Sequence, residues 1–168
     1  QLWLLGLLIM SMNISDKKIQ WMKIAFREAE KAFEHEEVPI GAIVVKNGTV
    51  IGRGYNQCET LQDATAHAEM IAITSAAHTI GDWRLEGCEL YVTKEPCLMC
   101  AGAIVNSRIK LVIFGAYDKN HGCASSLYQL CSSPKFNHRA AVRGGILQNE
   151  CKAIIQEFLQ TSKLDIPQ

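Results

Sequence analysis

The peptides HAEM, at residues 67–70, and EPCLMC, at residues 95–100, decide how the chain is interpreted. The first holds a histidine and a glutamate two residues apart, and the second holds two cysteines three residues apart. Cysteines at this spacing in the first turn of a helix lie on one face, and the positive end of the helix dipole favours their thiolates. The sequence between the peptides is long enough for a helix, a connection and a strand. Two helix N-termini that follow adjacent strands could therefore face a common point.

A metal ion would explain this combination of side chains. His67, Cys97 and Cys100 provide one imidazole and two thiolates, which leave a tetrahedral zinc one ligand short, as in catalytic rather than structural sites. Water takes the open position and loses a proton more readily there, and Glu69 is then available to move protons. The alternatives are unrelated core residues, or a thioredoxin-like redox pair, which would leave His67 and Glu69 without a role.

The chain has 168 residues, of which 48% are hydrophobic, as expected for one domain with a real core. The apolar start, QLWLLGLLIM, is shorter than the roughly 20 residues that span a bilayer, and it lacks the basic region and cleavage site of a secretory signal. We therefore expect residues 1–11 to be a non-native or upstream extension, with Met12 a plausible start, and residues 12–168 to form a single zinc-dependent domain. Seven cysteines without disulfide-scaffold spacing indicate reduced thiols in the cytoplasm.

The formal net charge of zero conceals an uneven distribution along the chain. Acidic residues outnumber basic ones by 12 to 8 up to residue 93, whereas basic residues outnumber acidic ones by 9 to 5 from residue 94 onward. Such a division is typical of faces that are solvated differently, or of a basic surface that binds a polyanion.

Hydrophobic periodicity predicts alternating helices and strands. Asn47-Gly48 between two β runs is a strong hairpin signal, and Pro96 suits the first turn of a helix. The alternation predicts an α/β fold, with a three-layer α/β/α arrangement around a mixed sheet of about five strands. The expected helices cover about residues 15–36, 65–78, 96–107 and 124–131 and continue from 149, and the expected strands lie within 40–56 and at 88–93, 110–116 and 141–145.

The His-x-Glu…Pro-Cys-x-x-Cys pattern is the signature of zinc-dependent nucleoside and nucleobase deaminases. From about residue 19 to residue 159 the chain resembles, more narrowly, the bacterial-type tRNA-specific adenosine deaminases, which have a cytidine-deaminase-like fold. The wider superfamily of cytidine, guanine and riboflavin-pathway deaminases shares only the zinc signature. The stretches that carry the narrower resemblance are EVPIGAIVV (37–45), GYN (54–56), DATAHAEMIAI (63–73), LYVTKEPCLMCAGAIVNSRIKLVIFGAYD (90–118) and NHR (137–139).

The resemblance implies that His67, Cys97 and Cys100 bind one zinc ion per chain. It also implies that Glu69 moves the protons while adenosine becomes inosine at wobble position 34 of a tRNA anticodon. By the same resemblance Asn56 holds the purine edge, although it could equally be a turn residue. Asp118 contacts the sugar-phosphate region of the target nucleotide, although it could equally cap a loop.

Further expectations follow from the resemblance. Pro39 and Ile40 line the pocket, the partner is a tRNA anticodon stem-loop, and the protein forms a homodimer and acts in the cytoplasm. Contacts with the RNA backbone are expected from Lys119, His138 and Arg139. Lys94 departs from the apolar residue usual in similar sequences. Two rival functions remain: deamination of free guanine or cytidine, and a non-catalytic zinc-binding subunit, against which the presence of Glu69 argues.

Overall fold

The computed structural model describes the backbone of residues 2–162 and the side chains of residues 16–162. Its centre is a five-stranded mixed sheet in the order β2-β1-β3-β4-β5. β1 is antiparallel to both β2 and β3, whereas β3, β4 and β5 are parallel. This confirms the expected mixed sheet of five strands. The strands are β1 (Gly41–Lys46), β2 (Thr49–Tyr55), β3 (Glu89–Lys94), β4 (Leu111–Ala116) and β5 (Ala141–Arg143).

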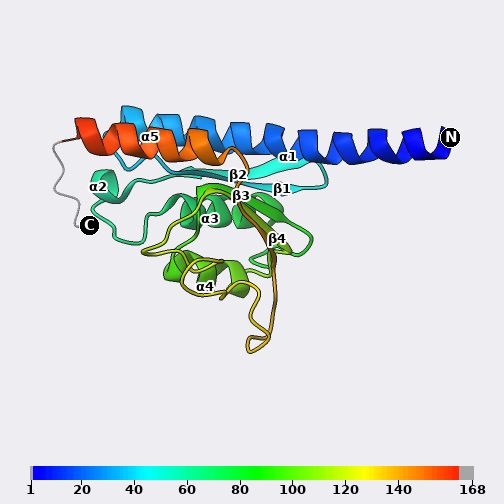
Figure 1. Cartoon of the computed structure of the whole chain (residues 1–168). Helices are drawn as coiled ribbons and strands as arrows, with labels where there is room; N and C mark the ends of the chain where they lie inside the picture. Colours follow the sequence, from blue (N-terminus) through cyan, green and yellow to red (C-terminus); the bar gives the residue numbers. More distant parts are fainter. Residues whose placement is uncertain (1, 163–168) are drawn as a thin grey trace.

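Helices cover both faces of the sheet, as Figure 1 shows. α1 (Leu2–Glu34) and α5 (Gln148–Thr161) lie on one face, and α3 (Ala68–Ile80) and α4 (Leu98–Asn106) lie on the other. Alternation along β1 produces the two interfaces, because side chains of successive residues point to opposite faces. Ile43 packs in the cluster that includes Met22 of α1, and Val44 packs in the cluster that includes Ala72 of α3.

The hairpin between β1 and β2 forms where the sequence predicts it. Asn47 and Gly48 have φ angles of 49° and 73°, the two positive values that a type I′ turn requires. Along β2, Gly52 and Gly54 lie directly under α3, where a Cβ atom would overlap the helix backbone at Ala72 and Ala68 respectively. These glycines let α3 approach the sheet closely, and they thereby fix the height of its N-terminus above the sheet.

Two expected helix starts are wrong. α1 does not begin at Ser15 but runs unbroken from Leu2, because the leucine- and methionine-rich stretch before Ser15 favours helix itself. Within the described residues, no helix combines the length and apolar character needed to cross a membrane. α4 begins at Leu98 with Cys97 as its N-cap, so Pro96 precedes the helix instead of occupying its first turn.

Other elements also depart from the expected pattern. The helix expected near residues 124–131 is absent, because the backbone N–H groups of Ser125 and Ser126 bond to the Glu95 carboxylate. β5 ends at Arg143, two residues early. A short helix that was not expected, α2 (Cys58–Leu61), lies between β2 and α3.

Candidate active site

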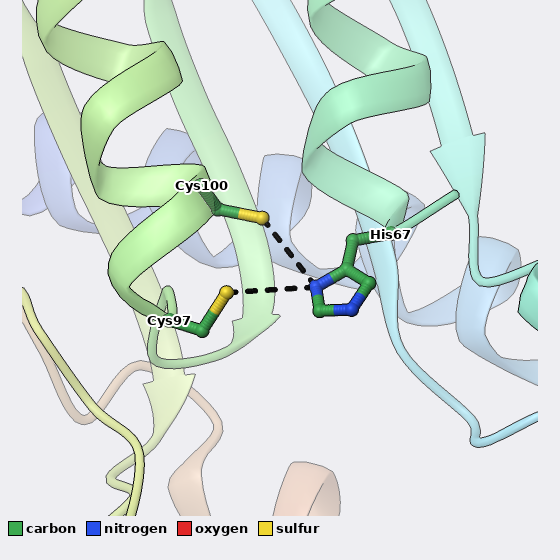
Figure 2. A group of neighbouring side chains, drawn as sticks. All are labelled: His67, Cys97 and Cys100. Carbon is green, nitrogen blue, oxygen red and sulfur yellow. Dashed lines mark hydrogen bonds between the residues drawn. The ribbon is translucent and has the colours of Figure 1, made fainter. Parts of the chain in front are cut away.

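The N-termini of α3 and α4 meet on one side of the sheet, as Figure 2 shows. His67 is the N-cap of α3, and its carbonyl oxygen accepts a hydrogen bond from the backbone N–H of Ile71. Cys97 is the N-cap of α4, and its carbonyl oxygen accepts in the same way from Ala101. Both N-caps have extended backbone angles, so their side chains lie at the N-terminal ends of the helices and not along the helix sides. Cys100, in the first turn of α4, completes the group.

The three side chains fit a tetrahedral zinc ion. Nδ1 of His67 lies 3.6 Å from Sγ of Cys97 and 3.6 Å from Sγ of Cys100, and all three ligand atoms lie within 4.8 Å of one another. Zinc–sulfur bonds of about 2.3 Å and zinc–nitrogen bonds of about 2.0–2.1 Å, at a tetrahedral angle, place sulfur and nitrogen about 3.6 Å apart. The N-termini of α3 and α4 therefore hold the three side chains at the distances that zinc ligands have from one another.

The pKa values of these three groups favour the thiolate form of Cys97. Hydrogen bonds from the Cys100 thiol and from His67 hold the pKa of Cys97 at about 3, well below its ordinary value. The hydrogen bond to Cys97 and burial raise the pKa of Cys100. The pKa of His67 is raised, chiefly by the same interaction with Cys97. Sulfur in the thiolate form is the metal ligand, so Cys97 is prepared to bind a cation.

Glu69 lies in the first turn of α3, two residues after His67, with only 4% of its surface exposed. Burial raises the pKa of its carboxyl to about 7. A carboxyl with this pKa can both accept and release a proton near neutral pH, which is the property required of a general acid–base catalyst.

A cavity of about 590 Å³ opens beside the ligands. This volume is within the range of pockets that hold small ligands. Its polar lining includes His67, Asn120 and His121. Its apolar lining includes two strongly exposed side chains, Leu98 at 71% and Tyr128 at 65% exposure.

Asn56 is buried at the end of β2 and connects two parts of the site. Its backbone N–H donates to the Ile40 carbonyl at 3.1 Å, and its side-chain Oδ1 accepts a hydrogen bond from the Ala68 N–H at 2.9 Å. The amide oxygen therefore caps α3 immediately after His67. The amide NH₂ group remains to donate to a ligand.

Asp118 follows β4 and is engaged by its own loop. Its Oδ1 accepts hydrogen bonds from the backbone N–H groups of Asn120 and His121, and its Oδ2 pairs with Nζ of Lys94 at 2.8 Å. Burial by itself would raise the pKa of this carboxyl. The Lys94 ammonium and the two N–H groups outweigh burial, so the pKa lies below its ordinary value. This geometry fits the loop-capping alternative.

The remaining expected site residues lie in different places. Pro39 is buried and Ile40 half-buried just before β1, and neither lines the 590 Å³ cavity. Lys119 is exposed next to Asp118, at the end of β4 nearer the ligands. His138 contacts the Ile109 carbonyl through Nε2 at 2.6 Å.

Because Ile109 precedes β4 and Asp118 follows it, His138 and the exposed Arg139 lie toward the end of β4 away from the ligand cluster.

Among the buried carboxylates, two that bond backbone N–H groups of loops or helix ends, Glu95 and Glu37, were missed at the sequence level. Glu95, 3% exposed, accepts hydrogen bonds from the backbone N–H groups of Asp118, Ser125 and Ser126 and from the Ser126 hydroxyl, and so fixes the loop that walls the cavity. Glu37 accepts from the first N–H groups of α2. The only sequence signal for Glu95 was an acidic residue directly before Pro96, just after a predicted strand.

Comparison with known proteins identifies the family. The model of the MafB19-like deaminases matches residues 16–163. The tRNA-specific adenosine deaminase of Bacillus subtilis is 50% identical over 140 residues, which cover 83% of this chain and 87% of that protein. The enzyme of the same name from Aquifex aeolicus is 46% identical over 149 residues, which cover 89% of this chain and 98% of that protein.

Solved structures agree with this assignment. A structure from a study of A-to-I editing by tRNA:A34 deaminases at the wobble position has 42% identity and a TM-score of 0.77, and the match covers 80% of this chain and 98% of that one. A guanine deaminase from Nitrosomonas europaea, at 21% identity and a TM-score of 0.70, covering 83% of each chain, shares the fold alone. The sheet with helices on both faces is thus the cytidine-deaminase-like fold. With the zinc-ligand geometry of His67, Cys97 and Cys100 in place, this chain belongs to the MafB19-like deaminases and to the tRNA-specific adenosine deaminases.

Proposed function

We propose that this protein converts adenosine to inosine at wobble position 34 of a tRNA anticodon, by hydrolysis that depends on one zinc ion per chain. The observation that carries the proposal is the placement of Nδ1 of His67 at 3.6 Å from both cysteine sulfurs, next to the buried carboxyl of Glu69. The family to which the chain belongs supports the choice of adenosine in tRNA as the substrate.

The chemistry divides between the metal and this chain's own residues. Zinc held by His67, Cys97 and Cys100 would supply Lewis-acid activation of water. Glu69 would accept a proton from the attacking water and deliver a proton to the departing amino nitrogen, and a pKa near 7 suits it for both transfers. The water oxygen bonds to C6 of the purine, the C6–N bond breaks, and ammonia leaves. One water is consumed, and the ring gains a carbonyl at C6 in place of the amino group.

Substrate orientation would rest first on Asn56. Its oxygen is occupied by α3, so its NH₂ group donates to an acceptor nitrogen of the purine. Pro39 and Ile40 would form the wall behind the base, in the chain segment that leads into β1. Asp118 would act near the sugar and phosphate, from a loop that its carboxylate already holds in shape.

The RNA partner would present an unpaired anticodon base, which is the form that can be turned out and buried in a pocket. Lys119 would contact the phosphate backbone near the site, and His138 and Arg139 would reach it only along the far part of β4. A second copy of the chain would cover the exposed Leu98 and Tyr128 in a homodimer. A cytoplasmic location agrees with the seven cysteines, none of which forms a disulfide.

The test is detection of inosine at position 34 after anticodon stem-loops are incubated with purified protein, alongside elemental analysis for zinc. We expect turnover by the wild type and about one zinc per chain. Glu69→Ala should retain the zinc and the fold but lose turnover, since proton transfer by a positioned group contributes about 10²–10⁴-fold. Efficient turnover of free guanine or cytidine, without inosine in the stem-loops, would establish the rival function instead.

A further inference from the structure

A second cavity, of about 450 Å³, lies on the face of the sheet that α1 covers. It is bounded by α1, by the Asn47–Gly48 turn and by the chain segments in which β3 and β4 begin, at Glu89 and Lys110. α1 runs along the sheet face opposite α3 and α4, as Figure 1 shows. Cys97 follows the other end of β3, and a strand of six residues separates its two ends by about 20 Å. This cavity is therefore separate from the candidate active site.

The cavity is positively charged. Lys17, Lys18 and Lys110 line it, and among the described residues none of their ammonium groups forms an ion pair with a carboxylate. The one acidic residue in the lining is Glu89, whose carboxylate accepts a hydrogen bond from the Tyr91 hydroxyl at 2.8 Å. Three cations around a hollow with a single anion repel one another and attract an anionic ligand.

An aromatic ring lies beside two of these lysines. Trp21 is half-buried and also lines the cavity. It stands three residues after Lys18 and four after Lys17, so all three side chains lie on the same face of α1. An indole ring is a platform on which a nucleobase stacks, and stacking tolerates any base.

The lining also contains an acceptor for hydroxyl groups. Glu89 is half-buried and has a second carboxylate oxygen beyond the one that Tyr91 bonds. A carboxylate in this role holds ribose hydroxyls in dinucleotide-binding folds. Gly48 and Gly87, at the rim, have no side chains, and a Cβ atom at either would meet nothing within 4 Å, so the rim is open.

We propose that this cavity is a nucleotide-binding site, distinct from the zinc site. The lysines bind the phosphate, Trp21 stacks on the base, and Glu89 accepts from the ribose. The phosphate and base belong either to a free nucleotide or to a nucleotide of an RNA strand that passes over α1. The proposal concerns binding and does not depend on turnover at the zinc site.

The experiment is calorimetric titration of the zinc-loaded full-length protein with GTP, which has phosphates, a base and a free ribose but no adenine amino group. The variants are Lys17→Ala combined with Lys18→Ala, Trp21→Phe and Glu89→Gln. The matched control is Lys23→Ala, an exposed lysine of the same helix that does not line the cavity. The double lysine variant should weaken GTP binding at least about tenfold, because each charged hydrogen bond that is lost matters this much. Trp21→Phe should weaken it less, and Lys23→Ala should leave it unchanged.

A second titration, with an RNA stem-loop in place of GTP, identifies the source of the phosphate. If the double variant loses affinity for GTP and keeps its affinity for RNA, the ligand is a free nucleotide. If it loses affinity for the stem-loop, and the stem-loop competes with GTP, the nucleotide belongs to RNA. The proposal is wrong if the double variant, folded as judged by its thermal midpoint, binds both probes as tightly as the wild type, or if the wild type binds neither.

Discussion

Oδ1 of Asn56 accepts a hydrogen bond from the backbone N–H of Ala68 at 2.9 Å, and this bond ties the end of β2 to the first residue of α3. One side chain thus serves both the fold and the candidate site. Its oxygen satisfies one of the helix N–H groups that have no partner within the helix. Only the NH₂ group is left for a substrate, so Asn56 can donate to a purine but cannot accept from it.

Substituting Asn56 should separate these two roles. Asn56→Asp keeps the acceptor oxygen, and its negative charge is favourable at a helix N-terminus. We expect it to retain fold and zinc but to lose roughly 10- to 100-fold in turnover, because about 1–3 kcal/mol of base recognition disappears with the donors. Asn56→Ala should also lose about 1 kcal/mol of unfolding free energy with the cap. Thermal unfolding and inosine formation measure the two effects. Undiminished turnover in Asn56→Asp would show that the NH₂ group does not contact the base.

Burial of Glu69 should give the metal-free protein a contribution to stability that is larger in acid than at neutral pH. Its pKa rises from 4.5 to about 7 on folding, so the folded state binds the proton more tightly than the unfolded state. The resulting stability is fully present below pH 4.5 and is lost as pH rises to about 7. Its size is on the order of 3 kcal/mol. Urea unfolding of chelator-treated protein at about pH 5 and about pH 8 measures it.

The control for this pH dependence is Glu69→Gln. It removes the titrating carboxyl but keeps a side chain of the same size. The raised pKa of His67 and the lowered pKa of Cys97 contribute in opposite directions, and both contributions are present in both proteins. We therefore expect the unfolding free energy of the wild type to fall between about pH 5 and about pH 8 relative to that of the variant. The same pH dependence in the two proteins would mean that Glu69 ionises normally within the fold.

The contact between Gly122 and Glu95 predicts a site-specific effect of adding one methyl group. A Cβ atom at Gly122 would overlap the Glu95 carboxylate that holds the loop at Ser125 and Ser126. Gly122→Ala should therefore displace the loop, lower turnover and lower the thermal midpoint. Gly102→Ala is the matched control, because a Cβ atom there meets nothing within 4 Å in the middle of α4. Helix propensity should make that variant up to about 1 kcal/mol more stable. Similar behaviour of the two variants would contradict the assigned role of Glu95.

The sequence predicted those parts of the fold that local chemistry determines. The Asn47–Gly48 turn needs two positive φ angles, and its residues supply them without help from the rest of the chain. The ligand group was predictable for a related reason. Cys97 and Cys100 share one helix turn, and His67 begins the helix that precedes the next strand.

Long-range contacts explain what the sequence did not reveal. The loop after β4 takes its shape from Glu95, which lies 30 residues before Ser125 in the sequence. Here a carboxylate accepts the hydrogen bonds that backbone carbonyls would accept in a helix, and such a contact leaves no periodic pattern in the sequence. Arg139 and Lys119 fall in the same basic segment of sequence. They nevertheless lie toward opposite ends of β4, because Ala141 pairs with Leu111 at the start of β4 and Lys119 follows its end.

Removal of zinc should lower the thermal midpoint, and the size of this decrease should depend on the three ligand residues and not on the other cysteines. Metal that binds the folded state alone adds about 2.7 kcal/mol at a free concentration one hundred times Kd. We expect a chelator to lower the thermal midpoint of the wild type, and added zinc to restore it. Cys97→Ser should weaken the response strongly, whereas Cys58→Ser, at a half-buried cysteine outside the ligand group, should not. A Cys97→Ser protein that still held one zinc per chain would rule out the proposed ligand set.

The positions of Lys119 and Arg139 predict different effects on RNA binding. Both are exposed, but Lys119 adjoins Asp118 at the end of β4 near the zinc ligands, and Arg139 adjoins His138 toward the other end. Each phosphate contact on single-stranded RNA adds about 0.7 to the slope of log affinity against log salt. We expect Lys119→Ala to reduce the slope for anticodon stem-loops by about this amount, measured between roughly 50 and 200 mM salt. Arg139→Ala should leave the slope unchanged if the RNA contacts only the rim of the zinc site. If Arg139→Ala also reduces it, the RNA reaches along β4 or crosses from a second copy of the chain. If neither substitution changes the slope, the basic segment does not bind the RNA backbone.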